Sequence, residues 1–127
     1  MRLDYLYDRL RRRATPSLDF DALSARYRAR NAAMVSEWRE RFPETDSAVL
    51  EVIIRASGNA RRRLKRYREF SSVRSGGPGI LYIRQPVSFD EILDFQMIEI
   101  GAAAARADVS DVEWRLLTVA EALTSAP

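Results

Sequence analysis

The fold expected of this chain depends first on residues 47–56, which read Ser-Ala-Val-Leu-Glu-Val-Ile-Ile-Arg-Ala. The apolar side chains of this segment would cover nearly every side of a helix, which is typical of a buried helix. Thr45 or Asp46 precedes the segment and can cap such a helix. We therefore expect a short helix over residues 47–56, buried at the centre of the domain.

The rest of the chain shows apolar residues at helical spacing on both sides of this segment. Further helices are expected over residues 3–14, 19–41, 59–73, 89–106 and 111–123. Two capping boxes, Ser88 with Glu91 and Ser110 with Glu113, mark the starts of the last two. The pattern is therefore helical over almost the whole chain.

These helices predict an all-α protein, a compact bundle of about six helices with a short extended segment near residues 80–85. The 127 residues suit a single domain. Within it we expect a basic helical part at 1–75, a Gly- and Pro-rich connector at 76–87 and an acidic helical hairpin at 88–127. The sequence leaves open whether the extended segment pairs with another strand.

The charge is divided between two parts of the chain. Residues 1–86 carry 19 Lys and Arg against 10 Asp and Glu, whereas residues 87–127 carry 2 against 8. Arginine supplies 20 of the 21 cations. This division favours partners that are held by charge, or copies of the chain that pack head to tail.

The chain contains no histidine and no cysteine, which removes the usual imidazole base, thiolate nucleophile and zinc ligands. Asp90, Glu91 and Asp94 fit a helix start followed by a solvated face better than a Mg²⁺ site. The glycine-rich loop at 76–79 lacks the Gly-Lys-Ser/Thr that completes a phosphate-binding loop. We therefore expect no enzyme, no cofactor and no metal site, and no small-molecule substrate is evident.

No apolar run in the sequence suits a signal peptide or a membrane span. The expected location is the cytoplasm, or a virion or other assembly if the chain derives from a phage. We expect no membrane contact.

The strongest functional signal lies in the helix expected at 59–73, where residues 61–68 supply six cations in eight positions. We call this the basic helix, and its guanidinium groups can bind phosphate in a bidentate manner. Tyr67, Phe70 and Tyr82 lie near it in sequence and could stack on unpaired bases, although Tyr67 shares a helix side with Leu64 and is expected in the core. Tyr7 and Trp114 lie off the main apolar stripes of their helices, which suits aromatic anchors. The expected partner-binding residues are Arg61, Arg62, Arg63, Lys65, Arg66, Arg68, Arg74, Tyr7 and Trp114.

Three short sequence features carry a resemblance to a known family. They are Leu18-Asp19-Phe20-Asp21-Ala22-Leu23, then Trp38 and Pro43, then Asp46-Ser47-Ala48-Val49-Leu50-Glu51. Over residues 18–75 the chain resembles the N-terminal helices of phage baseplate J-type wedge proteins. The resemblance implies a small structural component of a phage-tail-like or head–tail assembly.

Taken together, these patterns predict a non-catalytic helical adaptor or assembly subunit that binds a macromolecular partner, either another protein or a copy of itself. The alternative is a nucleic-acid-binding protein that uses the basic helix at 61–68. The sequence does not identify the partner or the oligomeric state. It also leaves open whether the basic helix contacts phosphate, protein or only solvent.

Overall fold

The computed structural model describes residues 6, 9–10 and 19–125, and it corrects the fold class. The protein is mixed α/β, with one four-stranded antiparallel sheet, so the prediction of an all-α bundle is wrong. The strands are β1 (Ser47–Arg55), β2 (Arg74–Gly77), β3 (Ile80–Ser88) and β4 (Val112–Leu117). The helices of the described part are α2 (Phe20–Arg41), α3 (Gly58–Lys65), α4 (Glu91–Arg106) and α5 (Val119–Thr124), with a 3₁₀ turn η1 (Arg68–Phe70).

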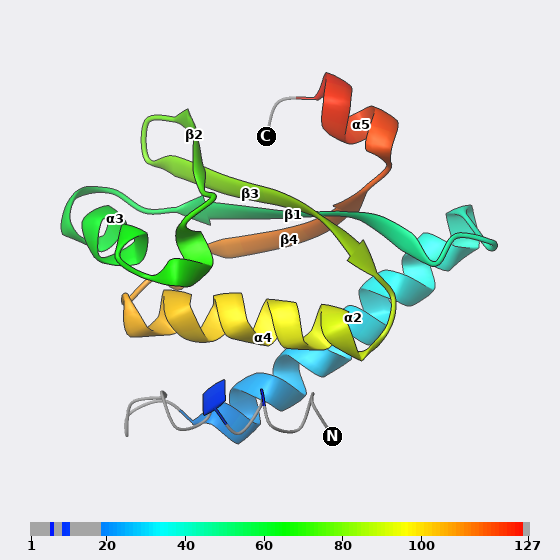
Figure 1. Ribbon diagram of the computed structural model, residues 1–127, viewed down its shortest axis with the longest axis horizontal. Helices are drawn as coiled ribbons and strands as arrows, with labels where there is room; N and C mark the ends of the chain where they lie inside the picture. Colours follow the sequence, from blue (N-terminus) through cyan, green and yellow to red (C-terminus); the bar gives the residue numbers. More distant parts are fainter. Residues whose placement is uncertain (1–5, 7–8, 11–18, 126–127) are drawn as a thin grey trace.

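The strands lie in the order β2-β3-β1-β4. From β1 onward the elements follow as β1-α3-β2-β3-α4-β4, which with this strand order is the split βαβ, or ferredoxin-like, arrangement. Helices α2 and α4 lie against one face of the sheet, and α5 lies on the opposite face (Figure 1). We call the face that carries α5 the open face.

The segment 47–56 is not a helix, since residues 47–55 form β1, the central strand. Its side chains alternate between the two faces of the sheet. The buried side chains that face α2 and α4 are Ala48, Leu50, Val52 and Ile54. The side chains on the open face include Val49, Glu51 and Ile53. The run is apolar on both faces of the strand apart from Glu51, and its β-branched residues favour the pleated conformation.

The segment 76–87 is not a loose connector. It contains the end of β2, a turn and most of β3, and β3 pairs with both β1 and β2. Gly77 and Gly79 have φ angles of 127° and 71°, a region that glycine enters without steric cost. The extended segment expected near residues 80–85 is thus a fully paired strand.

The segment 111–123 is not a single helix either. Residues 112–117 form β4, with Val112, Trp114 and Leu116 on the helix-covered face and Glu113 and Arg115 on the open face. Val112 and Leu116 also fit helical spacing, so two periodicities compete here, and sheet pairing with β1 selects the strand. The acidic helical hairpin expected at 88–127 is therefore α4, β4 and the short α5.

The structure confirms the helices expected at 19–41 and 89–106 as α2 and α4. The helix expected at 59–73 is shorter, since α3 ends at Lys65 and η1 follows. The helix expected at 3–14 lies mostly outside the described residues.

Helices α2 and α4 pack closely because α4 carries a glycine where they cross. A Cβ atom on Gly101 would lie 2.4 Å from Cε2 of Tyr27, so any larger residue would displace the tyrosine ring. The same two helices share a polar contact, in which Asn31 Nδ2 donates to Asp94 Oδ1 at 2.7 Å. These contacts form one wall of the core beneath the sheet.

Candidate functional site

The acidic segment of the sequence neutralises part of the basic segment within the same molecule. Arg55 donates from Nη1 to Glu113 Oε1 at 2.8 Å and to Asp111 Oδ1 at 3.2 Å. These hydrogen bonds, that to Glu113 first, raise the pKa of Arg55. Arg63 Nη2 lies 3.8 Å from Asp108 Oδ2. Two arginines of the basic segment therefore have acidic partners on the α4–β4 side of the molecule.

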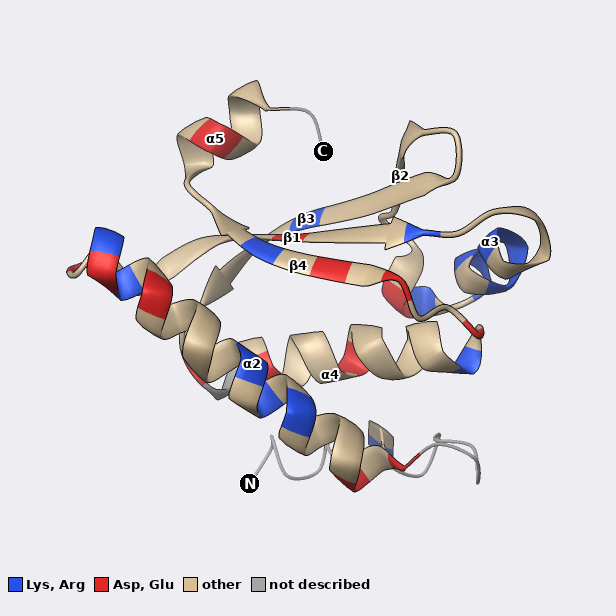
Figure 2. Ribbon diagram, turned by 180° about the vertical axis from the view of Figure 1, so that it is seen from behind, with Lys and Arg blue, Asp and Glu red and all other residues tan. Residues whose placement is uncertain are grey.

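Six cations around α3 and β2 have no such partner. We call this group the basic end, and its members are Arg61, Arg62, Lys65, Arg66, Arg68 and Arg74. None of them forms an ion pair with a residue of the described part of the chain. Five are exposed and Arg61 is half-buried. Figure 2 shows the basic residues covering much of the α3 ribbon.

Apolar side chains fix the basic end from below. Leu64 of α3 and Phe70 of η1 are both fully buried in the core. Tyr67 lies between them, half-buried, with the Arg106 guanidinium 5.2 Å from its ring centroid. The expectation that Tyr67 packs with Leu64 agrees with this placement. Five of the six cations of the basic end thus point outward from a short, firmly anchored segment.

Tyr82 brings an aromatic ring next to the basic end. It lies on the open face of β3, directly across the β2–β3 pair from Arg74. The Arg84 guanidinium lies 5.5 Å from its ring centroid, and the side chain is half-buried. The ring is therefore held in place and still reachable from solvent.

The two other aromatic anchors predicted from the sequence do not join the basic end in the described structure. Tyr7 lies outside the described residues. Trp114 lies on the helix-covered face of β4, and its ring centroid is 5.2 Å from that of Tyr27, in an edge-to-face arrangement. This contact indicates that Trp114 packs between the sheet and α2.

A buried ion-pair network on the open face was not expected from the sequence. Glu51 is fully buried, and Arg84 Nε donates to its Oε2 at 2.7 Å while Arg115 Nε donates to its Oε1. The two remaining nitrogens of Arg84 donate to the backbone oxygens of Ala122 and Ser125, each at 2.7 Å. Glu51 is the lone acid within an apolar run, which is the sequence signal for a buried charge that needs partners.

An apolar groove lies at the other end of β1, lined on one side by the C-terminal end of α2 and on the other by α5. Its volume is about 450 Å³. Its apolar lining includes Trp38, Phe42, Val49, Pro86, Val119 and Leu123. Val119 and Leu123 are 65% and 81% exposed and are the only large hydrophobic residues exposed in the described part of the chain. We refer to this feature as the apolar groove.

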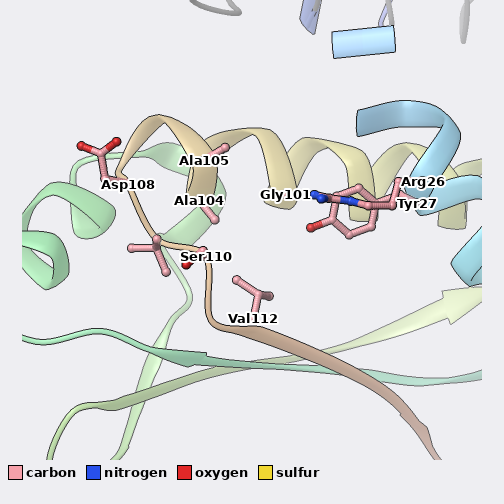
Figure 3. Close-up of a pocket in the computed structure, with 9 residues that line it drawn as sticks. Arg26, Tyr27, Gly101, Ala104, Ala105, Asp108, Ser110 and Val112 are labelled. Atoms are coloured by element: carbon pink, nitrogen blue, oxygen red, sulfur yellow. The ribbon is translucent and has the colours of Figure 1, made fainter. Parts of the chain in front are cut away.

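A second hollow, of about 430 Å³, lies between α2, α4 and the loop before β4 (Figure 3). The Tyr27 ring lies beside Gly101 in this hollow, and Arg26 lies 5.4 Å from the ring centroid. Asp108 at its edge is the partner of Arg63. The charged side chains of this hollow, Arg26 and Asp108, thus already contact Tyr27 and Arg63. The basic end carries more unpaired charge and is therefore the stronger candidate for a binding site.

Within the described residues, no three acidic side chains lie close enough together to hold a metal ion. Asp94 instead accepts the hydrogen bond from Asn31. Over the same part of the chain, every helix is too short or too polar to cross a lipid bilayer.

Comparisons of the chain with protein-family models, curated proteins and solved structures return no match. The resemblance of residues 18–75 to J-type wedge proteins therefore stays a prediction. Its segment 46–51 lies at the start of β1 and not in a helix. The class that fold and surfaces define is a split βαβ domain with an unpaired basic end and a separate apolar groove.

Proposed function

We propose that this chain is a non-catalytic adaptor that binds a macromolecular partner, and that the partner at the basic end is a nucleic acid. One observation carries the proposal: the six cations of the basic end have no acidic partner in the described structure. A concentrated group of unneutralised cations attracts a polyanion, and no ion pair within the described structure has to break when the cations contact it.

A nucleic acid suits this surface better than a protein does. The centre of a protein interface is apolar and poor in charge, whereas the apolar residues of this segment, Leu64 and Phe70, are buried beneath the cations. Arginine supplies five of the six cations, and its planar guanidinium matches the geometry of phosphate. The neighbouring ring of Tyr82 adds a surface on which an unpaired base can stack.

Fluorescence anisotropy with a labelled single strand of about 16 nucleotides, and with the matching duplex, tests the proposal across a salt series. The logarithm of the binding constant should fall linearly with the logarithm of the salt concentration. For the single strand, each phosphate contact should contribute about −0.7 to that slope. Arg62→Ala combined with Arg66→Ala should weaken binding and reduce that slope by about 1.4. Tyr82→Leu should weaken the binding of the single strand by about 1–3 kcal/mol and leave the binding of the duplex unchanged.

The matched control is Arg26→Ala combined with Arg30→Ala, which removes the same charge from exposed positions of α2. This control should keep the wild-type slope, because α2 lies outside the basic end. Absence of binding at low salt would contradict the proposal. An equal loss in both double variants would show that only net charge matters, and would also contradict it.

A further inference from the structure

The apolar groove combines a cavity and protruding side chains on one patch. Trp38, Phe42 and Val49 line it on the α2 and β1 side. Val119 and Leu123 rise from α5 at its other wall and remain largely exposed. A single chain leaves this apolar surface in water, where its exposure is unfavourable.

Polar contacts fix α5 in this position, since none of its residues is buried. At its start, Thr118 Oγ1 accepts from the Glu121 backbone N–H at 3.1 Å, and Glu121 Oε1 accepts from the Thr118 backbone N–H at 3.0 Å. At its end, Arg84 donates to the backbone oxygens of Ala122 and Ser125. The short helix therefore presents its apolar side chains outward in a set geometry, which lowers the entropic cost of docking them on another surface.

We propose that the apolar groove is the interface of a homodimer, in which Val119 and Leu123 of each copy enter the groove of the other. A second copy is the occupant that supplies both missing parts at once, because the same patch holds the cavity and the side chains that fill one. A contact of this kind is isologous and closes with two-fold symmetry.

The charges at the rim of the groove agree with a second copy as the occupant. Arg41 lies 5.8 Å from the Trp38 ring centroid and 5.1 Å from that of Phe42. Glu121 lies on α5, and Arg41 is close enough to contribute to the lowered pKa of its carboxyl, after the larger contributions of Thr118. One cation and one anion flank the same patch, so a two-fold contact can place Arg41 of each copy near Glu121 of the other.

Sedimentation velocity across the micromolar range tests the dimer directly. The wild-type chain should form a dimer, and Leu123→Glu should raise the dimer dissociation constant about tenfold or more. The matched control is Ala120→Glu, which adds the same charge to an exposed position of α5 that does not line the groove. Leu123 is 81% exposed, so the far-UV circular dichroism of both variants should match that of the wild type.

Disulfide trapping gives a second measurement, since the chain contains no cysteine. Thr45 also lines the groove. A mixture of the Leu123→Cys and Thr45→Cys proteins should form a disulfide between copies under mild oxidation. A mixture of Ala120→Cys and Thr45→Cys should not.

Three results would overturn the homodimer. The wild type could be monomeric over the whole concentration range, Ala120→Glu could dissociate the dimer as strongly as Leu123→Glu, or the trapped disulfide could be absent. A monomer that binds anilinonaphthalene sulfonate in the groove, with binding lost in Val49→Glu, would assign the groove to a different apolar partner. None of these measurements involves nucleic acid, so failure of the dimer and failure of the proposed function are distinguishable.

Discussion

Glu51 is a fully buried carboxylate that is held between two arginines of unequal exposure. The side chain of Arg84 is 17% exposed, whereas that of Arg115 is 49% exposed. Removal of one member of a buried pair is costly, because the other charge is left without a partner in a poorly solvated position. A half-exposed partner loses much less, because water replaces the lost contact.

This asymmetry predicts the stability of two variants. Glu51→Ala should lower the free energy of unfolding by about 3–5 kcal/mol, because it leaves the largely buried Arg84 guanidinium without its carboxylate partner. Arg115→Ala should lower it by less than about 1 kcal/mol, since Glu51 keeps its bond to Arg84. Urea denaturation at neutral pH measures both losses, and a loss in Arg115→Ala as large as that in Glu51→Ala would contradict the minor role of the half-exposed Arg115.

At the scale of single elements, the cap of α5 makes that helix sensitive to acid. The Thr118 backbone N–H, and then the Thr118 side chain, lower the pKa of Glu121 below its ordinary value of 4.5. A carboxylate whose pKa is lowered by folding stabilises the folded state above its ordinary pKa, and the contribution is lost as the pH falls through the lowered value. The start of α5 should therefore remain intact down to pH 4.5 and loosen below it.

The amide resonance of Thr118 in an NMR pH titration reports this cap. Its chemical shift should titrate with a midpoint below 4.5, the ordinary pKa of the Glu121 carboxyl. Glu121→Gln provides the control, since it removes the titrating group and should abolish that transition. A midpoint at or above the ordinary value would contradict the capping role of the carboxylate.

The elements also show how far sequence periodicity can predict this fold. α2 and α4 are long enough for helical spacing to repeat several times, and both were predictable. β1 was not, because a short run that is apolar on both faces of the strand has no alternation to distinguish it from a buried helix. In β4 the alternation of Val112, Trp114 and Leu116 was present in the sequence, but Val112 and Leu116 satisfy the helical spacing equally well.

The residues of the basic end were predictable as a charged cluster, but their freedom from partners was not. That freedom depends on contacts across the fold, such as those of Arg55 with Asp111 and Glu113, which are 56 and 58 positions away in sequence. The apolar groove depends likewise on α2, β1, β3 and α5, which meet only in the folded chain. Helical periodicity therefore assigned Val49 to a buried helix and gave no sign that Leu123 would be exposed beside a groove.

At the scale of the whole molecule, β1 separates the two proposed surfaces. The groove lies at its Ser47 end and the basic end follows its Arg55 end. The nine residues of the strand extend over roughly 30 Å. A homodimer formed at the grooves would therefore carry two basic ends on opposite sides of its interface, and a nucleic acid long enough to reach both would be held bivalently.

Bivalent binding makes the length dependence of affinity a test of the two proposals together. A strand that contacts both basic ends should bind the wild type up to about 100-fold more tightly than a short strand does, because the second contact is intramolecular. Leu123→Glu should keep its affinity for the short strand and lose most of this gain, whereas Ala120→Glu should keep the gain. Any strand gains some affinity with length simply because it offers more binding positions. The length dependence of Leu123→Glu, the monomeric variant, measures this statistical part of the gain. Competition anisotropy with a series of strand lengths supplies both values, and an identical length dependence in wild type and Leu123→Glu would mean that the two basic ends bind independently.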